Sequence, residues 1–253
     1  MVFLRQVSIP SPQREQQGKF PFSLALFRDG LEIEFNNAVT VFAGENASGK
    51  STLLESLGVK CGFAHQGGYY GHTIRKTVGT NGFGEAIERD FDNLSLADNM
   101  RLVWNRRHHA GFFLRAEYMS ETLAQYVTAE AYLSCSHGEG LLEVIKDKFK
   151  EGLFILDEPE TALSPTSQLA LLSLIHENSK RFNAQYIIVT HSPILMAIPE
   201  SDFFWIGDGK LTKMDYRQST PFIVTKAFCN NPDKMIAQVN AEENGERPQN
   251  MCL

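Results

Sequence analysis

The sequence predicts an α/β fold with a mixed, mainly parallel central sheet, an N-terminal antiparallel β layer and a short helical lobe. Two continuous apolar runs, Leu153–Leu156 and Tyr186–Val189, are typical of parallel strands that are buried on both faces. By contrast, Leu31–Phe35 alternates apolar and acidic residues, as expected of a strand with one buried face. These observations distinguish a buried parallel sheet from a half-exposed antiparallel layer.

Each apolar run is followed by a serine-proline pair, at Ser164-Pro165 and Ser192-Pro193. Serine is a favourable helix N-cap and proline a favourable first helical residue, so both pairs predict helix starts. Repeated strand-loop-helix units place ligands beyond the carboxyl ends of the strands. We therefore expect the chemistry in three loops, at residues 44–51, 157–164 and 190–192.

The other elements follow from local pattern. Strands are expected at 3–9, 22–27, 31–35, 39–44, 100–104, 111–115, 203–206 and 211–216, and helices at 50–59, 85–93 and 119–132. Arg28-Asp29-Gly30 and Gly207-Asp208-Gly209 predict hairpin turns, and the glycine-rich residues 61–84 predict a loop. One domain is expected at 1–240, with a core lobe at about 1–60 and 150–240, a helical lobe at about 61–149, and a flexible tail at 241–253.

Composition excludes several classes of protein. The 253 residues include 43% hydrophobic residues, an ordinary globular share, and the net charge of −6 argues against coating of nucleic acid through bulk charge. The four cysteines form no Cys-x-x-Cys pair, which favours reduced thiols over a disulfide framework. No signal-peptide core and no apolar run of membrane-spanning length is present, so we expect a soluble, cytoplasmic protein.

The stretch after the strand Val39–Ala43 fits the phosphate-binding loop pattern Gly-x-x-x-x-Gly-Lys-Ser at every fixed position. Its glycines let successive backbone N–H groups turn toward phosphate, and the helix that follows adds its positive end. Lys50 would neutralise the β- and γ-phosphates and Ser51 would ligate Mg²⁺. The predicted nucleotide-binding residues are Gly44, Glu45, Asn46, Ala47, Ser48, Gly49, Lys50, Ser51 and Thr52.

Asp157-Glu158 directly follows the apolar strand Leu153–Leu156. A carboxylate at such a strand end can reach the Mg²⁺ shell, which makes Asp157 a predicted metal-side residue. Glu158 lies one residue closer to the γ-phosphate, where it can orient and polarise the attacking water. Parallel strands of one sheet would place this pair beside the phosphate loop.

With these motifs the chain resembles the ATPase domains of the ABC superclass. The resemblance covers Walker A, the signature-like Cys135–Glu139, Walker B with its glutamate, the D-loop-like Glu160–Ser164 and the switch-like Thr190-His191-Ser192, in the order that the family has. It implies ATP and Mg²⁺ as cofactors, a γ-phosphate contact from His191, and a head-to-tail homodimer. Each ATP would then lie between Walker A of one subunit and Ser136, Gly138 and Glu139 of the other.

The signature-like segment also has a local interpretation. Ser136-x-x-Glu139 is a capping box, followed by apolar residues on one helical face: Leu141, Leu142, Ile145 and Phe149. A capped helix N-terminus can also present backbone N–H groups to a phosphate, so the two interpretations are compatible. His191 could be a buried strand-end histidine, but its position after the strand favours the phosphate contact.

The pattern departs from the family at two places. The family glutamine that touches Mg²⁺ has no clear counterpart; Glu117, after the strand Gly111–Arg115, occupies the corresponding place and is a candidate metal ligand, with Gln66 as the weaker alternative. Phe20 and Phe22 are candidates for stacking on adenine, although core packing accounts for both. The segment between Lys50 and Ser136 contains no heptads, which excludes a long coiled-coil arm and leaves a compact head with a short helical lobe. Because of its acidic His137-Gly138-Glu139 and its N-terminal hairpin layer, the chain resembles the small soluble ATPases related to SMC and RecF heads more than transporter subunits.

Two further clusters have alternative interpretations. Arg106-Arg107-His108-His109, with Arg101, Arg115 and Trp104 nearby, fits either a phosphate-backbone contact or a solvated turn. Cys61-x-x-x-His65 with Cys135-x-His137 could bind zinc, but the second pair already belongs to the signature-like segment.

The expected function is an ATP-hydrolysing head that dimerises around Mg-ATP and moves a partner, either DNA or an effector protein, in DNA repair, chromosome maintenance or phage defence. The alternatives are a nucleotide-binding subunit of an ABC transporter and a non-catalytic, ATP-gated DNA- or protein-binding module.

Overall fold

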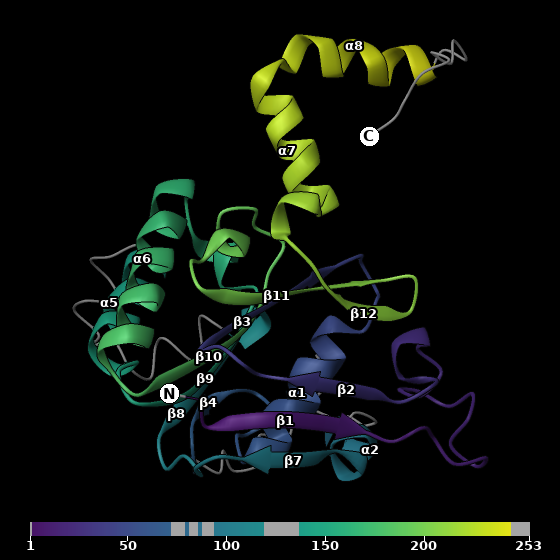
Figure 1. The fold of residues 1–253 in the computed structure, drawn as a ribbon, viewed down its shortest axis with the longest axis vertical. Coiled ribbons are helices and arrows are strands. Elements are labelled where there is room, and N and C mark those ends of the chain that lie inside the picture. The colour runs from purple at the N-terminus through teal and green to yellow at the C-terminus, as the bar shows by residue number, and fades with distance from the viewer. Residues whose placement is uncertain (1, 72–78, 81–85, 88–93, 119–136, 244–253) are drawn as a thin grey trace.

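The computed structural model describes residues 2–71, 79–80, 86–87, 94–118 and 137–243 (Figure 1). Its strands are β1 (Leu4–Ile9), β2 (Leu31–Glu34), β3 (Val39–Gly44), β4 (Gly68–Tyr69), β5 (Gly79–Thr80), β6 (Ala86–Ile87), β7 (Arg101–Trp104), β8 (Gly111–Arg115), β9 (Gly152–Asp157), β10 (Ala184–Val189), β11 (Ser201–Gly207) and β12 (Lys210–Lys213). Its α-helices are α1 (Lys50–Cys61), α2 (Leu94–Asn99), α5 (His137–Lys148), α6 (Pro165–Arg181), α7 (Thr220–Asn230) and α8 (Pro232–Glu243), joined by short 3₁₀ turns.

The central sheet has the strand order β12-β11-β3-β10-β9-β8-β4. Neighbours from β11 to β8 run parallel, and the two edge strands β12 and β4 pair antiparallel. Every residue of β3, β9 and β10 is buried, as their continuous apolar sequences predict. The predicted fold class, a P-loop-type α/β fold with a mixed, mainly parallel sheet, is confirmed.

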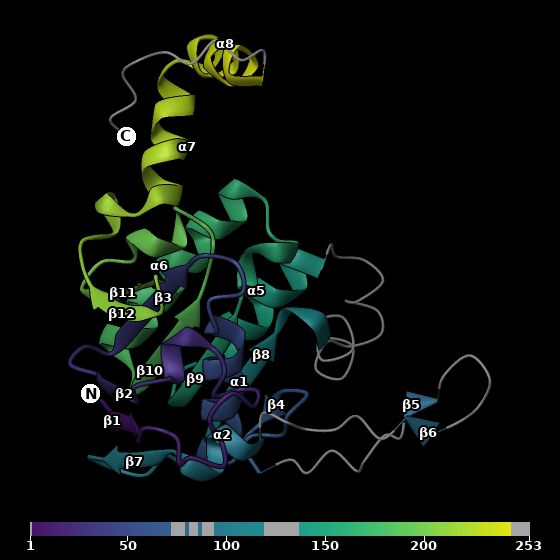
Figure 2. The same cartoon turned by 90° about the vertical axis from the view of Figure 1, so that its right-hand side faces the viewer.

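Helices cover both faces of this sheet. On one face, α1 packs with Phe42, Ile155 and Ile187 in a core that also includes the N-terminal β layer. On the other face, α5 and α6 pack against Leu156, Tyr186 and neighbouring side chains of the same strands (Figures 1 and 2). The carboxyl end of each central strand is thereby fixed by packing on two sides.

The N-terminal layer is a three-stranded antiparallel sheet in the order β2-β1-β7. The amide of buried Gln185, on β10, joins this layer to the central sheet: its Oε1 accepts from the backbone N–H of Phe3 and Leu4, both at 2.8 Å, and its Nε2 donates to the Leu4 carbonyl at 2.9 Å. The prediction of an N-terminal antiparallel layer is confirmed.

The strand expected at 22–27 is wrong. This stretch forms turns and the 3₁₀ helix Ala25–Phe27, and its buried residues Phe22, Leu26 and Phe27 follow helical spacing instead of alternation. The hairpin expected at 28–30 is therefore wrong as well, because β2 pairs with β1. A short apolar run is compatible with either period, and here the packing selects the helical one.

Other predictions need smaller corrections. Ala86–Ile87, expected in a helix, forms a strand that pairs with Gly79–Thr80; it follows glycines at 82 and 84, which disfavour a helix. Pro193 begins only a short 3₁₀ turn, Leu195–Ala197, because Pro199 cannot continue a helix. Residues 241–243, expected in the tail, end α8. The helix expected at 119–132 and residues 244–253 lie outside the described residues.

The helices α7 and α8 were not predicted. They project away from the body of the protein (Figures 1 and 2), and α7 contacts mainly α8 and the 3₁₀ turn Tyr216–Gln218. Ser219 precedes α7 and Pro221 lies in its first turn, so the serine and proline signals used elsewhere were present here too. Within the part of the chain that the structure describes, no helix is both long and apolar enough to cross a bilayer.

Candidate functional site

The three loops expected to carry chemistry meet at one edge of the central sheet. In the parallel register, Val189 of β10 lies beside both Phe42 of β3 and Asp157 of β9. The loops after these three strands therefore leave the sheet at the same level. The prediction that residues 44–51, 157–164 and 190–192 gather together is confirmed by this register.

The phosphate-loop sequence turns sharply between β3 and α1. A Cβ atom at Gly44 would lie 2.1 Å from the carbonyl oxygen of Ile206, so only glycine fits beside β11. Ala47 and Gly49 have positive φ values of 59° and 97°, and α1 begins directly afterwards at Lys50. The loop thus wraps around the N-terminus of α1, whose backbone N–H groups and dipole favour an anion.

Lys50 lies at the centre of this loop with 5% of its surface exposed. Its Nζ donates to the carbonyls of Gly44 at 3.1 Å and Glu45 at 2.6 Å. Burial lowers the pKa of Lys50, and the negative charges of Glu158 and Asp157 partly oppose that effect. The ammonium group is therefore held close to the Walker B carboxylates. A bound phosphate would stabilise its charged form, which burial disfavours.

Asp157 ends β9 and is 6% exposed. Its Oδ1 is buried and has no hydrogen-bond partner among the described residues. Burial, together with the neighbouring charge of Glu158, raises the pKa of Asp157 to about 7, although the charge of Arg115 acts in the opposite direction. A buried carboxylate oxygen without a donor fits a cation ligand, so the site suits Mg²⁺ held by Asp157 and the Ser51 hydroxyl.

Glu158 follows in a left-handed conformation, with φ 46° and ψ 54°. Its backbone N–H donates to the Val189 carbonyl at 2.9 Å, and its own carbonyl accepts from the Thr161 hydroxyl at 2.8 Å. Non-glycine residues adopt this conformation only where their surroundings enforce it. Glu158 Oε1 lies 3.3 Å from His191 Nε2, and each side chain is about one-third exposed. Two of the three residues that the sequence predicts to be catalytic, Glu158 and His191, are therefore in direct contact, and the third is Lys50.

Glu160 holds the loop that carries His191, a role that the sequence did not reveal. Its Oε1 accepts from the backbone N–H of His191 at 2.6 Å and of Ser192 at 3.2 Å, while its buried Oε2 lacks a partner among the described residues. The Ser192 hydroxyl in turn donates to Gln168 at 2.5 Å. The segment after Walker B thereby determines the position of the switch histidine. Sequence assigned Glu160 only to a D-loop-like segment, because a side-chain contact to a distant backbone leaves no local pattern.

A buried ion pair between Arg115 and Glu55 lies next to the Walker B strand and influences Asp157. Arg115, at the end of β8, is 4% exposed and bonds to Glu55 on α1, and its Nη1 donates to the His65 carbonyl at 3.0 Å. Arg115 pairs in register with Asp157, so its charge acts on that carboxylate. Glu117 is 73% exposed and lies 3.5 Å from Arg115. A metal contact from Glu117, or from Gln66, stays a prediction.

The signature-like segment is described only in part. Ser136 lies outside the described residues; Gly138 and Glu139 lie in the first turn of α5, which begins at His137, and their side chains are not described. Leu141, Ile145 and Phe149 are buried, as the predicted apolar face requires. Phe22 is buried in the core and Phe20 is 47% exposed. The zinc alternative rests partly on residues beyond the described ones, and no metal-ligating cluster occurs among those that are described.

Comparison with known proteins agrees with this geometry. Residues 22–101 match the family model of an AAA domain. The chain is 28% identical over 209 residues to the thiamine import ATP-binding protein ThiQ of Vibrio parahaemolyticus, covering 76% of this chain and 86% of ThiQ. It is 25% identical over 242 residues to the phosphate import ATP-binding protein PstB of Bacteroides fragilis, covering 82% and 87%. The predicted resemblance to ABC-superclass ATPase domains is confirmed.

Solved structures of similar fold include the SMC head domain from Thermotoga maritima, with 15% identity and a TM-score of 0.43 over 84% of this chain and 98% of that domain. A putative metal-chelate type ABC transporter has 17% identity and a TM-score of 0.44 over 87% and 88% of the two chains.

Proposed function

We propose that this chain is an ATP-binding and ATP-hydrolysing head that closes head to tail with a second copy around Mg-ATP. The observation that carries the proposal is the contact between Glu158 and His191, beside Asp157 with its unpartnered oxygen and within electrostatic reach of Lys50. Phosphoryl transfer requires a cation, a metal-ligating carboxylate, a water-activating carboxylate and a hydrogen-bond donor to the γ-phosphate.

Each side chain has a defined part in this proposal. Lys50 would exchange its loop carbonyls for the β- and γ-phosphate oxygens, and Ser51 and Asp157 would hold Mg²⁺, which would neutralise phosphate charge. Glu158 orients the attacking water and accepts its proton. His191 Nε2, which lies against Glu158 in the nucleotide-free protein, would turn to donate to the γ-phosphate, with its backbone held by Glu160. Water is thus positioned before it reacts, which is the main source of catalysis in such sites.

The second copy would complete the site through the N-terminus of its α5. By the resemblance to ABC ATPases, its Ser136, Gly138 and Glu139 would face the γ-phosphate. The position of Gly138 and Glu139 in the first described turn of α5 is compatible with this assignment, because the N-terminus of a helix presents backbone N–H groups and a positive dipole end to a phosphate. Turnover would then depend on dimer closure, and closure would drive a partner, DNA or an effector protein, in DNA repair, chromosome maintenance or phage defence.

A second candidate is the nucleotide-binding subunit of an importer. The observation that favours it is the similarity to ThiQ and PstB over most of the chain. It predicts that the purified protein associates with a membrane protein. If an affinity-tagged chain retains a membrane permease and its ATPase activity depends on that permease, the importer assignment replaces the partner proposed above.

The test is the variant Glu158→Gln, which keeps the shape of the side chain but cannot accept a proton. With Mg-ATP it should form a stable dimer by light scattering and release no phosphate. The matched control is Glu151→Gln, an exposed glutamate just before the opposite end of β9, which should behave as wild type.

A variant that stays monomeric at saturating Mg-ATP would refute the dimer. Wild-type protein that dimerises with ATP but releases no phosphate would instead indicate the non-catalytic, ATP-gated binding module.

A further inference from the structure

A pocket of about 420 Å³ lies at the end of α1 opposite the phosphate loop. Lys60, in the last turn of α1, contributes to its wall, while Lys50 begins the same helix in the nucleotide site. At 1.5 Å per residue the two lysines are about 15 Å apart along the helix axis. The pocket is therefore separate from the candidate ATP site.

Among the described residues, the charged groups that line this pocket are all positive. They are Lys60, Arg101 and Arg107, all three are exposed, and no carboxylate of the described part of the chain joins them. Among the described residues, none of the three forms an ion pair, and Lys60 reaches only the backbone carbonyl of Asp98, at 3.5 Å. In a chain of net charge −6, three unpaired cations around one hollow form a local anion site.

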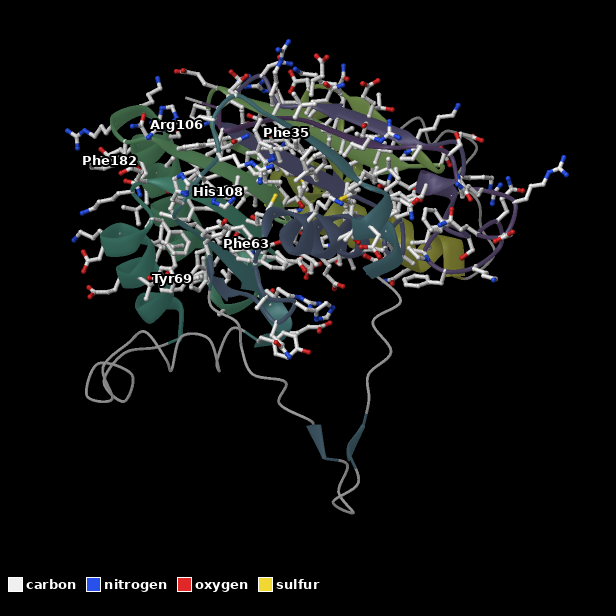
Figure 3. The ribbon with its side chains drawn as sticks, turned by 90° about the horizontal axis from the view of Figure 1, so that it is seen from below. Phe35, Phe63, Tyr69, Arg106, His108 and Phe182 are labelled. Atoms are coloured by element: carbon white, nitrogen blue, oxygen red, sulfur yellow. The ribbon has the colours of Figure 1, made fainter. Side chains whose placement is uncertain are left out.

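The rings of Tyr70, Trp104 and His108 also line the pocket, together with the apolar side chains of Cys61, Met100 and Leu102. His108 is 4% exposed; its ring stacks on Phe63 with centroids 5.6 Å apart, and it contacts Trp104 at 5.2 Å and Tyr70 at 4.6 Å. Its Nδ1 lies 3.0 Å from the Ala110 carbonyl, which fixes the ring. Figure 3 shows His108 and Phe63 close together on the underside of the protein.

The rings of this cluster are packed at different angles: His108 stacks on Phe63 at 15°, whereas Trp104 is tilted by 38° and Tyr70 by 65° from the His108 ring. Burial lowers the pKa of His108, so the imidazole contributes a neutral ring near pH 7. Tyr70 is 36% exposed and Trp104 is partly buried, which leaves aromatic surface open to a ligand. The pocket thus combines aromatic faces with three cations on one wall.

We propose that this pocket binds a nucleoside phosphate, with the base against Trp104 and Tyr70 and the phosphate between Lys60, Arg101 and Arg107. Bases stack on aromatic side chains whatever their identity, and arginine and lysine bind phosphate. The volume is at the lower end of small-ligand pockets, so it suits one nucleotide unit. That unit is either a free nucleotide or the end of a single strand. The site does not depend on ATP hydrolysis by this chain.

The test uses the fluorescence of Trp104. The sequence contains two tryptophans, so Trp205→Phe leaves Trp104 as the sole indole reporter. Thymidine 5′-monophosphate, a short 5′-phosphorylated oligothymidylate and ribose 5-phosphate are titrated without Mg-ATP. Stacking should quench Trp104 with the first two ligands only. Quenching by the mononucleotide at equal affinity indicates a free nucleotide as the ligand, whereas a much tighter oligothymidylate indicates a strand end.

Arg107→Gln, in the same background, should weaken binding about tenfold, because it removes one charge-assisted contact. The control is Arg217→Gln, in the 3₁₀ turn Tyr216–Gln218 that precedes α7 and outside the pocket lining, which should leave the affinity unchanged. The proposal is overturned if neither thymidine ligand quenches Trp104 at millimolar concentration. It is also overturned if ribose 5-phosphate competes as well as the nucleotide, or if both arginine variants lose affinity equally.

Discussion

Replacing Asp157 by asparagine should stabilise the nucleotide-free protein while removing Mg²⁺-dependent ATP binding. Asp157 is buried, and its Oδ1 has no donor among the described residues. Burial and the charge of Glu158 raise its pKa from 3.8 to about 7. A carboxyl group whose folded-state pKa is raised destabilises the fold in full above that pKa, and the penalty disappears as pH falls toward the unfolded-state pKa.

The magnitude follows from the two pKa values. A pKa of about 7 in place of 3.8 corresponds to about 4 kcal/mol of destabilisation at about pH 8. At about pH 5 the folded-state carboxyl is protonated, and the penalty relative to the unfolded chain falls to about 2 kcal/mol. The amide introduced by Asp157→Asn carries no charge at either pH. The stabilisation by this substitution should therefore be about 2 kcal/mol larger at the higher pH, or several degrees in Tm.

The assay is thermal or urea unfolding of wild type and Asp157→Asn in chelator, across this pH range. The control is Asp202→Asn. Burial would raise the pKa of Asp202, but hydrogen bonds from Lys213, Asn36 and Asn37 lower it overall, so its replacement should destabilise the protein. The reasoning is refuted if the Tm difference between wild type and Asp157→Asn is the same at all pH values, or if Asp157→Asn has the lower Tm. Either result would show that the buried charge of Asp157 does not destabilise the fold.

The remaining predictions concern groups around the same edge of the sheet. Glu160→Gln weakens the hydrogen bond that Glu160 accepts from the His191 backbone N–H. It should lower the rate of phosphate release about tenfold with little change in KM for ATP. An unchanged rate would contradict that role of Glu160. Gly44→Ala forces a methyl group against the Ile206 carbonyl and should cost about 3 kcal/mol in urea unfolding, so a neutral effect would refute the close approach. Arg115→Met removes the guanidinium that pairs with buried Glu55 and should cost about 3–5 kcal/mol in the same assay, with a loss near zero as the contradicting result.

Sequence predicted the central sheet because the rule behind it is strict. A strand buried on both faces must be apolar throughout, and β9 and β10 satisfy that rule at nearly every position. Their parallel pairing then required the loops that follow them to meet. The same rule predicts that Lys50, Asp157, Glu158 and His191 lie at the carboxyl-terminal edge of the central sheet.

Prediction failed where two patterns had equal support. Residues 22–27 carry apolar residues at both strand and helix spacing, and only tertiary packing selected the 3₁₀ turn. Ser164-Pro165 and Ser192-Pro193 are the same dipeptide, yet the first begins a helix of 17 residues and the second a single turn. The difference lies downstream, at Pro199, and a local capping rule does not include it.

Glu160 and the Arg115–Glu55 pair were missed for another reason: each joins side chains or backbone that are distant in sequence. The contacts of the charged groups also explain why the Asp157 carboxylate has an oxygen without a hydrogen-bond donor among the described residues. Lys50 is held by the carbonyls of Gly44 and Glu45, and Arg115 is held by Glu55, so neither cation donates a hydrogen bond to the Oδ1 of Asp157. Asp157 keeps a raised pKa and an unpartnered oxygen as a result. Holding these charges in place lowers the stability of the nucleotide-free protein. Binding of a cation and a phosphate would offset that loss of stability.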